Sequence, residues 1–483
     1  MKQTILSLGK DSLIYGIGSV VLRFISMLLL PLFTTYLSPV DYGVIAMLNI
    51  LTMVAHPVFS LGLSAAMGPS YFNTSDPKNK SRAVWTTFTI HLASGVLLLI
   101  AAWVFPAPIG TLVRLPAEYA RLVSLKLTAS ALTILATALI ERVQFEKQAK
   151  RYVAITFVTA LTATLSSLYF VVRLEWGVYG VIAGALIGNA ISLSAFFVLA
   201  WKANTPTYCP KMCKELLSLG LPLVPSFAFL FILMHSNKYI LEWLYGLDAV
   251  GIYSIGFNFG TTISIITSGF ATAYYPFFMS YLARQEEGRE ILARVFTYYI
   301  LGVGVLCLLF FLFANPLVQL LTQPAFWSAS RVVGLVAIAY YFQGAFNHFL
   351  PALYYTRDVK YVTFVQGGAA IAGLLITFVL VNSLNIVGAA LGLAIGNLTM
   401  AMLMFWWVKA KPERYVQIPY DWKQLAMFGL LFVCVVSINQ LTMHDSIMLN
   451  IFQSILGFVI TIVLVFFLLD RRERSMILAC FKH

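Results

Sequence analysis

Positively charged and imidazole side chains stand inside long apolar stretches of this sequence. Arg23 lies in the middle of the apolar run 13–33, and His235 and Lys238 share a second such run. A charged residue at the centre of a membrane-spanning helix costs about 2.5–3.5 kcal/mol on insertion scales and is by default a candidate functional residue. The planar donor fork of arginine matches phosphate oxygens. These residues favour binding of an anion such as a phosphate or pyrophosphate.

Arg23 belongs to a stripe of small and polar side chains at helical spacing. Its members are Ser12, Gly16, Ser19, Arg23, Ser26, Leu30 and Thr34. The other faces carry Leu, Ile, Val, Phe and Met, so we expect Arg23 to face a wet cavity or a neighbouring helix. Substrate binding is the first interpretation. The alternative is a structural arginine that is neutralised by backbone carbonyls or by a buried partner.

Further polar stripes occur in other predicted spans. One reads Asn49, Thr52, His56 and Ser60, and another predicted span carries Gln343, Asn347 and His348. Such stripes can simply hold helices together. Their presence in both halves of the chain favours a hydrophilic cavity instead. The candidate substrate-binding residues are therefore Arg23, Lys238, His56, His235, Asn347 and His348.

Lys238 also has a structural interpretation. Glu242 follows it at i+4 and can pair with it, or the lysine can extend its stem towards the outer interface. Lys126, close to the outer end of its own predicted span, is expected to do the latter. We predict no catalytic residue and no cofactor. A metal site is not expected either, because Cys209 and Cys213 share one short loop without further Cys or His partners.

The composition assigns these residues to a membrane protein. Of 483 residues, 60% are hydrophobic and only 11% are charged, and the mean hydropathy is +0.86. Soluble domains are about 25% charged. Apolar runs of about 20 residues recur, each long enough to cross the hydrocarbon core as a helix. The sequence predicts an all-α integral membrane protein with about fourteen transmembrane helices, the first at residues 12–36.

The net charge of +13 reflects topology and does not require nucleic acid as a partner. Most Lys and Arg residues fall in predicted loops on the side of the N-terminus. The loops of the opposite side hold Arg114, Arg121, Arg173 and Arg331. Positive residues accumulate on the cytoplasmic side of membrane proteins. We therefore expect both termini to be cytoplasmic.

The chain repeats itself. "YGVIAGALIGN" at 179–189 matches "VGAALGLAIGN" at 387–397, and "FEKQAKRYV" at 145–153 matches "YYTRDVKYV" at 354–362 at nearly the same offset. The repeat holds six predicted spans, an even number, so both copies enter the membrane in the same orientation. Parallel repeats of this kind build transporters with the substrate between two bundles.

The predicted organisation has three parts. These are a six-helix bundle at 1–201, a second at 215–409, and an added transmembrane hairpin at 424–469. The two bundles are expected to be related by a pseudo-two-fold axis along the membrane normal.

Two motifs carry a resemblance to a known family. "LFTTYLSPVDYGVIAMLN" at 32–49 and "YGLDAVGIYSIGFNFG" at 245–260 resemble the bacterial polysaccharide transporter family. These are O-antigen-type lipid-linked oligosaccharide flippases of the multidrug/oligosaccharidyl-lipid/polysaccharide exporter superfamily. The resemblance implies movement of an undecaprenyl-pyrophosphate-linked O-antigen, capsule or exopolysaccharide unit to the outer leaflet of the plasma membrane, by alternating access.

In such flippases, cavity cations on the first and the seventh or eighth helices are thought to meet the pyrophosphate, and Arg23 and Lys238 match those placements. This chain has Asn237–Lys238 where many relatives have Asp–Arg, and "MGPSYFN" at 67–73 where many have an arginine. More of the anion binding is therefore expected from Arg23. The implied partners are the lipid-linked oligosaccharide, membrane lipid, a proton or Na⁺ as coupling ion, and the polymerase and chain-length proteins of the same pathway.

Other functions stay open. A multidrug/cation antiporter of the same superfamily would need carboxylates at mid-membrane, and a lipid II-type flippase would share the anionic substrate. A membrane glycan polymerase or ligase would be expected to show a large external loop with clustered Arg, His or Asp. The predicted external loops are short, so an enzyme is not expected.

Overall fold

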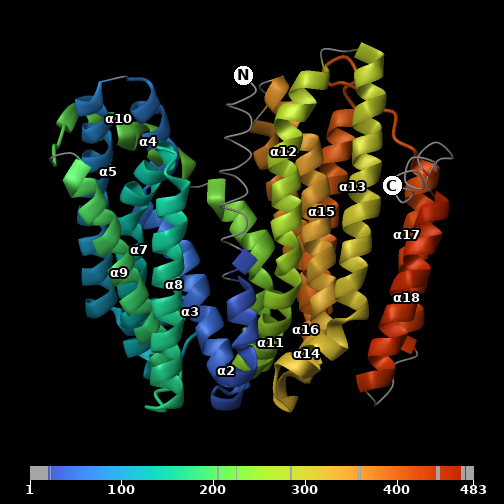
Figure 1. The fold of residues 1–483 in the computed structure, drawn as a ribbon, viewed down its shortest axis with the longest axis horizontal. Helices are drawn as coiled ribbons and strands as arrows, with labels where there is room; N and C mark the ends of the chain where they lie inside the picture. The colour runs from blue at the N-terminus through green and yellow to red at the C-terminus, as the bar shows by residue number, and fades with distance from the viewer. Residues whose placement is uncertain are drawn as a thin grey trace. The chain divides into compact units, whose positions relative to one another are not determined.

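The computed structural model describes residues 20–21, 23–74, 76–203, 206–224, 226–282, 285–356, 358, 360–441, 447–468 and 474. Within these residues all regular elements are helices, which confirms the predicted all-α class (Figure 1). The chain divides into two compact units, Met1–Phe231 and Ile232–His483.

The first unit is a bundle of long helices with short connecting ones. After helical residues 23–28, it contains α2 (Leu30–Tyr36), α3 (Pro39–Ser60), α4 (Leu63–Phe72), α5 (Pro77–Val104), α6 (Pro106–Leu112), η1 (Ala117–Tyr119), α7 (Ala120–Phe145), α8 (Ala149–Val172), α9 (Val178–Ala203), α10 (Pro210–Gly220) and η2 (Leu221–Leu223).

Local sequence explains where these helices begin. Pro39 occupies the first turn of α3, where its missing N–H is not needed. The Ser38 hydroxyl accepts a hydrogen bond from the Asp41 N–H at 3.2 Å, and the Asp41 carboxylate accepts one from the Ser38 N–H at 2.8 Å. This capping box satisfies two backbone donors at the helix start. Asp76 and Pro77 begin α5 in a similar way.

The second unit has the same general construction. Its elements are the larger part of α11 (Ser226–Gly260), η3 (Thr261–Ile263), α12 (Ser264–Leu282), α13 (Gln285–Leu312), α14 (Ala314–Leu321), η4 (Pro324–Ala329), α15 (Ser330–Tyr355), α16 (Lys360–Lys409), α17 (Trp422–Leu441) and α18 (Ile447–Leu468).

Two continuous helical stretches are in fact helical hairpins. Gly246 interrupts α11 with a φ of 81°, and Asn385 interrupts α16 with a φ of 52°. Glycine and asparagine are the residues that adopt this left-handed region most easily. In α16 the two arms pack antiparallel against each other, which is seen in the contact between Gly392 of the second arm and Thr377 of the first. Both turns fall in gaps between spans that the sequence predicts, the first pair at 216–244 and 250–275 and the second at 361–381 and 386–408.

Eleven helices of the described part are long and apolar enough to cross a membrane, counting each hairpin stretch once. This confirms a multi-pass membrane protein. The predicted number of fourteen is not established, because much of the predicted first span at 12–36 lies outside the described residues.

Glycines allow the closest helix approaches in both units. A Cβ on Gly184 of α9 would lie 2.6 Å from the Ala163 carbonyl oxygen of α8, and one on Gly392 would lie 2.7 Å from the Thr377 Cα. Both distances are too short for any side chain. The glycines of the two repeated motifs therefore perform the same packing task, although the two-fold relation between bundles stays a prediction.

One predicted helix is divided in the structure. The expected span at 216–244 consists of α10 and the first arm of α11, with η2 between them. Leu216 of α10 is fully buried in a core cluster with Leu63, Met67 and Trp85. This short helix therefore packs on the first unit and does not extend α11.

The added hairpin observed at α17 and α18 matches the predicted spans closely. The Ser454 hydroxyl of α18 donates to the Leu312 carbonyl of α13 at 2.6 Å, and the Phe428 ring of α17 fills the space above Gly304 of α13. The hairpin thus packs on the second unit through α13.

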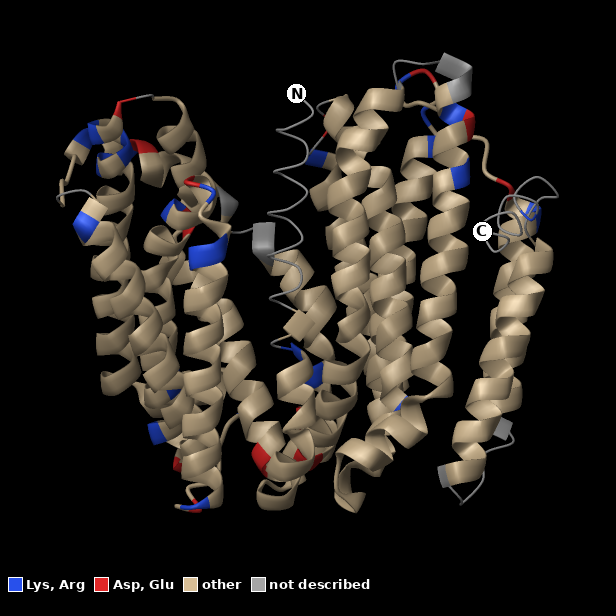
Figure 2. Cartoon of the chain, in the orientation of Figure 1, with Lys and Arg blue, Asp and Glu red and all other residues tan. Residues whose placement is uncertain are grey.

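The basic residues gather mostly near one end of the helices in each unit (Figure 2). In the first unit that end includes the start of α5, the α7–α8 turn and the end of α9, which carry Lys78, Lys80, Arg82, Lys147, Lys150, Arg151 and Lys202. This is the end predicted to face the cytoplasm, and its sidedness stays a prediction.

Candidate functional site

Arg23 stands on the helical residues that precede α2, and its side chain is half-buried. Of its predicted stripe, Ser12, Gly16 and Ser19 lie outside the described residues. Ser26 is exposed. The Thr34 hydroxyl donates a hydrogen bond of 3.0 Å to the Leu30 carbonyl oxygen of the same helix. The described part of the stripe is therefore polar but not uniformly buried.

His56 lines an open pocket of about 270 Å³ in the first unit. The pocket lies between α3, α7 and α9, which pack against one another. Its polar lining consists of Thr52, His56, Lys126, Ser130, Thr133 and Asn189. The pocket thus places the predicted stripe of α3 opposite small polar side chains of α7.

Lys126 is the residue of this pocket that sequence reasoning missed. Its ammonium group donates to the Asn49 Oδ1 at 2.7 Å, so it is directed across to α3 and is not extended outwards as expected. A signal was available, since Lys126, Ser130 and Thr133 follow helical spacing. Asn189, at the end of the first repeated motif, donates its amide to the Ala129 carbonyl at 2.9 Å.

A buried histidine lies close to the same α3 face. His91 of α5 is fully buried, and its Nε2 lies 3.3 Å from the Ser60 carbonyl oxygen. Its Nδ1 has no hydrogen-bond partner among the described residues. Ser60, the last member of the predicted stripe, thus contacts α5 and does not line the pocket.

Lys238 lies in the second unit, in the first arm of the α11 hairpin, and is only 8% exposed. Its ammonium group lies 4.4 Å from the centroid of the Phe257 ring, on the other arm. The neighbouring Asn237 donates to the Tyr253 hydroxyl at 2.6 Å. No ion pair joins Lys238 to Glu242 or to any other carboxylate in the described part of the chain.

His235 joins this group, with its ring centroid 6.4 Å from that of Phe257. The structure therefore brings two predicted residues, Lys238 and His235, around one aromatic ring. A cation over the face of an aromatic ring is stabilised by about 0.5–2 kcal/mol, most when it is desolvated. The Phe257 ring thus stabilises the buried Lys238 ammonium group without supplying an opposite charge.

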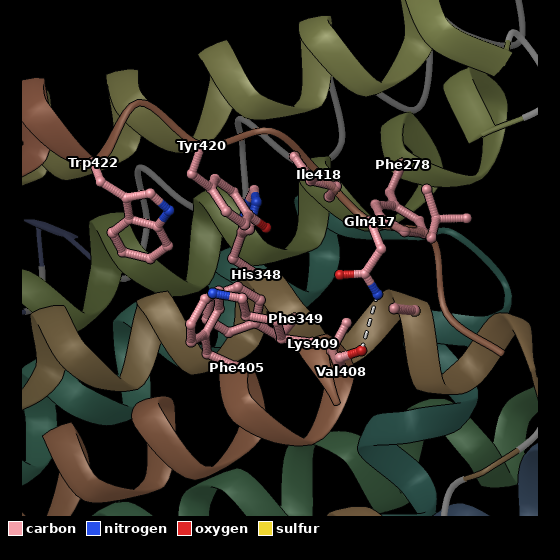
Figure 3. A pocket seen from close by; sticks show the side chains of 12 residues that line it. Phe278, His348, Phe349, Phe405, Val408, Lys409, Gln417, Ile418, Tyr420 and Trp422 are labelled. Carbon is pink, nitrogen blue, oxygen red and sulfur yellow. Dashed lines mark hydrogen bonds between the residues drawn. The ribbon is translucent and has the colours of Figure 1, made fainter. Parts of the chain in front are cut away.

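His348 does not belong to the group around Phe257. It lies on α15, in a separate aromatic cluster. It is 2% exposed, stacks on Tyr274 at 4.1 Å between centroids, and shares a hydrogen bond of 3.0 Å with the Tyr274 hydroxyl. It lines a cavity of about 70 Å³ with Phe349, Tyr420 and Gln417, whose amide donates to the Val408 carbonyl at 3.1 Å (Figure 3). Asn347, its neighbour, is half-buried.

Metal binding has no support in the described ranges, where no three His, Cys, Asp or Glu side chains come together. The separate groups described in the two units offer cations, imidazoles, hydroxyls and amides. These groups can bind an anionic, hydroxyl-rich molecule.

Solved structures with the same fold are membrane transporters. The lipid II flippase MurJ, in an inward closed conformation, matches with a TM-score of 0.68 and 14% identity over 94% of this chain and 98% of that chain. A multidrug resistance MATE family transporter of the MOP superfamily, inward-facing, matches with a TM-score of 0.66 and 14% identity over 81% of this chain and 94% of that chain. An outward-facing structure of a multidrug resistance MATE family transporter matches with a TM-score of 0.56 and 16% identity, over 84% of this chain and 95% of that chain.

At these identities the similarity is one of fold. No curated protein matches the sequence. A family model described as "Polysaccharide biosynthesis protein" matches residues 32–321, which is more than half of the chain. The resemblance to polysaccharide transporters is thereby confirmed, and the chain belongs to this polysaccharide biosynthesis protein family.

Proposed function

We propose that the protein is a flippase for an oligosaccharide linked to undecaprenyl pyrophosphate, such as an O-antigen, capsule or exopolysaccharide unit. It would move this lipid from the inner to the outer leaflet of the plasma membrane by alternating access of its two bundles. Membership of a polysaccharide biosynthesis family supports a role in glycan assembly. The fold supports transport rather than catalysis.

The observation that carries the proposal is the buried charge of Lys238. Its ammonium group faces the Phe257 ring and has no carboxylate in an ion pair among the described residues. Arg23, on the other unit, is a further cation in the middle of a predicted span. A positive charge in an apolar helix costs free energy unless a partner offsets it. A pyrophosphate would be such a partner, present only when substrate is bound.

The experiment is deletion of the gene in its own host. Lipid-linked oligosaccharide should then accumulate on the inner leaflet, the surface glycan should disappear, and a plasmid copy should restore it. The readouts are surface glycan and the lipid-linked units that a lectin cannot reach from outside in spheroplasts. An unchanged surface glycan in the deletion strain contradicts the proposal.

A lipid II-type flippase is the second candidate, because the fold likeness to the lipid II flippase extends over 94% of this chain. It is tested by depleting a host of its own lipid II flippase and supplying this protein. Restored growth would favour this candidate. Continued lysis together with a glycan defect in the deletion strain would favour the first.

A further inference from the structure

We infer that the pocket between α3, α7 and α9 binds an acidic sugar unit, meaning a sugar that bears one carboxylate. The inference rests on the proposed flippase function and adds the charge of the glycan to it. It concerns a site in the first unit that is separate from Lys238, which lies in the second.

The charge of the pocket comes from Lys126. The hydrogen-bond partner of its ammonium group in the described part of the chain is the neutral amide oxygen of Asn49, at 2.7 Å. No Asp or Glu lines the pocket. An ammonium group has three donors, so two are left for a ligand. One negative charge is favoured beside an ammonium group that has no carboxylate in the lining around it.

The other polar groups of the pocket present mainly acceptors. The Thr52 hydroxyl donates to the Asn49 carbonyl at 2.8 Å, and the Thr133 hydroxyl donates to the Ala129 carbonyl at 3.1 Å. The Asn189 amide group also donates to Ala129. Since both hydroxyl hydrogens are already bound, the two hydroxyl oxygens and the Asn189 Oδ1 remain to accept, and the Asn189 amide keeps one N–H to donate. Acceptors of this kind bind a ligand that carries several hydroxyl groups.

The volume limits the ligand to one small unit. The pocket measures about 270 Å³, close to the lower end of the 300–1,000 Å³ range that is typical of small-molecule pockets. A pyrophosphate brings more than one negative charge, and one lysine balances only one. A single hydroxyl-rich ring with one carboxylate matches both the charge and the acceptors, whereas a neutral sugar leaves the charge unmatched.

The test measures binding to the purified full-length protein in detergent micelles. The probes are glucuronate and glucose, which differ in the carboxylate, and saturation-transfer NMR titrations give both affinities. We expect glucuronate to bind at least about tenfold more tightly than glucose, since hydrogen bonds to charged groups contribute that much. Lys126→Met should reduce glucuronate binding to the glucose level, and Lys126→Arg should retain most of it.

The matched control is Lys150→Met, which removes an exposed lysine at the basic end of α8 and should leave both affinities unchanged. Thermal unfolding of each variant reports whether it is folded. Equal affinity for the two sugars, no saturable glucuronate binding, or a Lys126→Met protein that binds glucuronate normally would overturn the inference.

The proposed function is judged by a different readout, the export of glycan in the host. If export requires the gene but the pocket does not distinguish the two sugars, only the acidic-sugar inference fails. If glucuronate binds through Lys126 but export does not require the gene, the flippase proposal fails and the binding site stands.

Discussion

The ammonium group of Lys238 lies over the ring of Phe257, which stands on the opposite arm of the same helical hairpin, at 4.4 Å from the ring centroid. The turn at Gly246 makes this contact, because it folds the two arms together. The ring stabilises the buried ammonium group but does not neutralise it. No carboxylate pairs with Lys238 among the described residues, so we expect its charge to be open to an anionic ligand.

This relationship predicts a measurable coupling between the two side chains. In a double-mutant cycle of Lys238→Met and Phe257→Leu, the coupling free energy of unfolding should be about 0.5–2 kcal/mol. Phe257→Leu also loses packing against Tyr253, and the cycle removes that contribution. The measurement is equilibrium unfolding in mixed SDS micelles. A coupling of zero would mean that the contact does not stabilise the charge.

Arg23 is predicted to be required for transport and dispensable for folding. Arg23→Ala should abolish surface glycan at normal membrane abundance, since it also removes the cost of inserting a charge. Arg23→Lys should retain part of the export, because the charge remains and the bidentate donor geometry is lost. Arg121→Ala, at an exposed position in α7, is the control and should export normally. Normal glycan from a well-expressed Arg23→Ala protein would show that Arg23 is structural.

The orientation of the chain can be tested by cysteine labelling. On a background without the five native cysteines, Cys is placed at the exposed residues Lys78 or Ala117. An impermeant thiol reagent outside intact cells should label position 117 and leave position 78 unlabelled until the cells are permeabilised. The reverse pattern would place the termini outside.

A fourth prediction concerns the linker that leads to the added hairpin. Asp358 is 4% exposed, forms an ion pair with Arg414, and accepts a hydrogen bond from the Tyr415 hydroxyl at 2.8 Å. Burial alone would raise the pKa of Asp358, but the hydrogen bonds from Arg414, Tyr415 and Thr356 outweigh it, and the pKa lies below its ordinary value. These contacts tie the α16–α17 linker to the α15–α16 turn.

Asp358→Asn should therefore lower the midpoint of thermal unfolding at neutral pH. Because the folded-state pKa is depressed, the stabilisation is complete above the ordinary aspartate pKa of about 3.9 and is lost as the pH falls through the folded value. The difference between wild type and Asp358→Asn should thus shrink below about pH 4. Glu413→Gln, an exposed carboxylate in the same linker, is the control. Equal midpoints for all three proteins would mean that the linker contact does not contribute to stability.

The sequence was sufficient for the membrane class and for most helix limits. Apolar length is a property of consecutive residues, so α17 and α18 lie close to the predicted spans, and the gaps around Gly246 and Asn385 coincide with the hairpin turns. The repeated motifs were likewise visible in the sequence, and the structure shows that their glycines allow close helix approach. Such patterns are periodic along the chain and need no knowledge of neighbours.

The directions of individual side chains were decided only by tertiary structure. Lys126 was expected at the outer interface, yet packing of α3 against α7 brings Asn49, far away in the sequence, within hydrogen-bond distance of it. Packing of α12 against α15 likewise places Tyr274 on His348, a partner that helical spacing did not indicate. Helical spacing says which residues share a face, but the partner of that face depends on how distant helices pack.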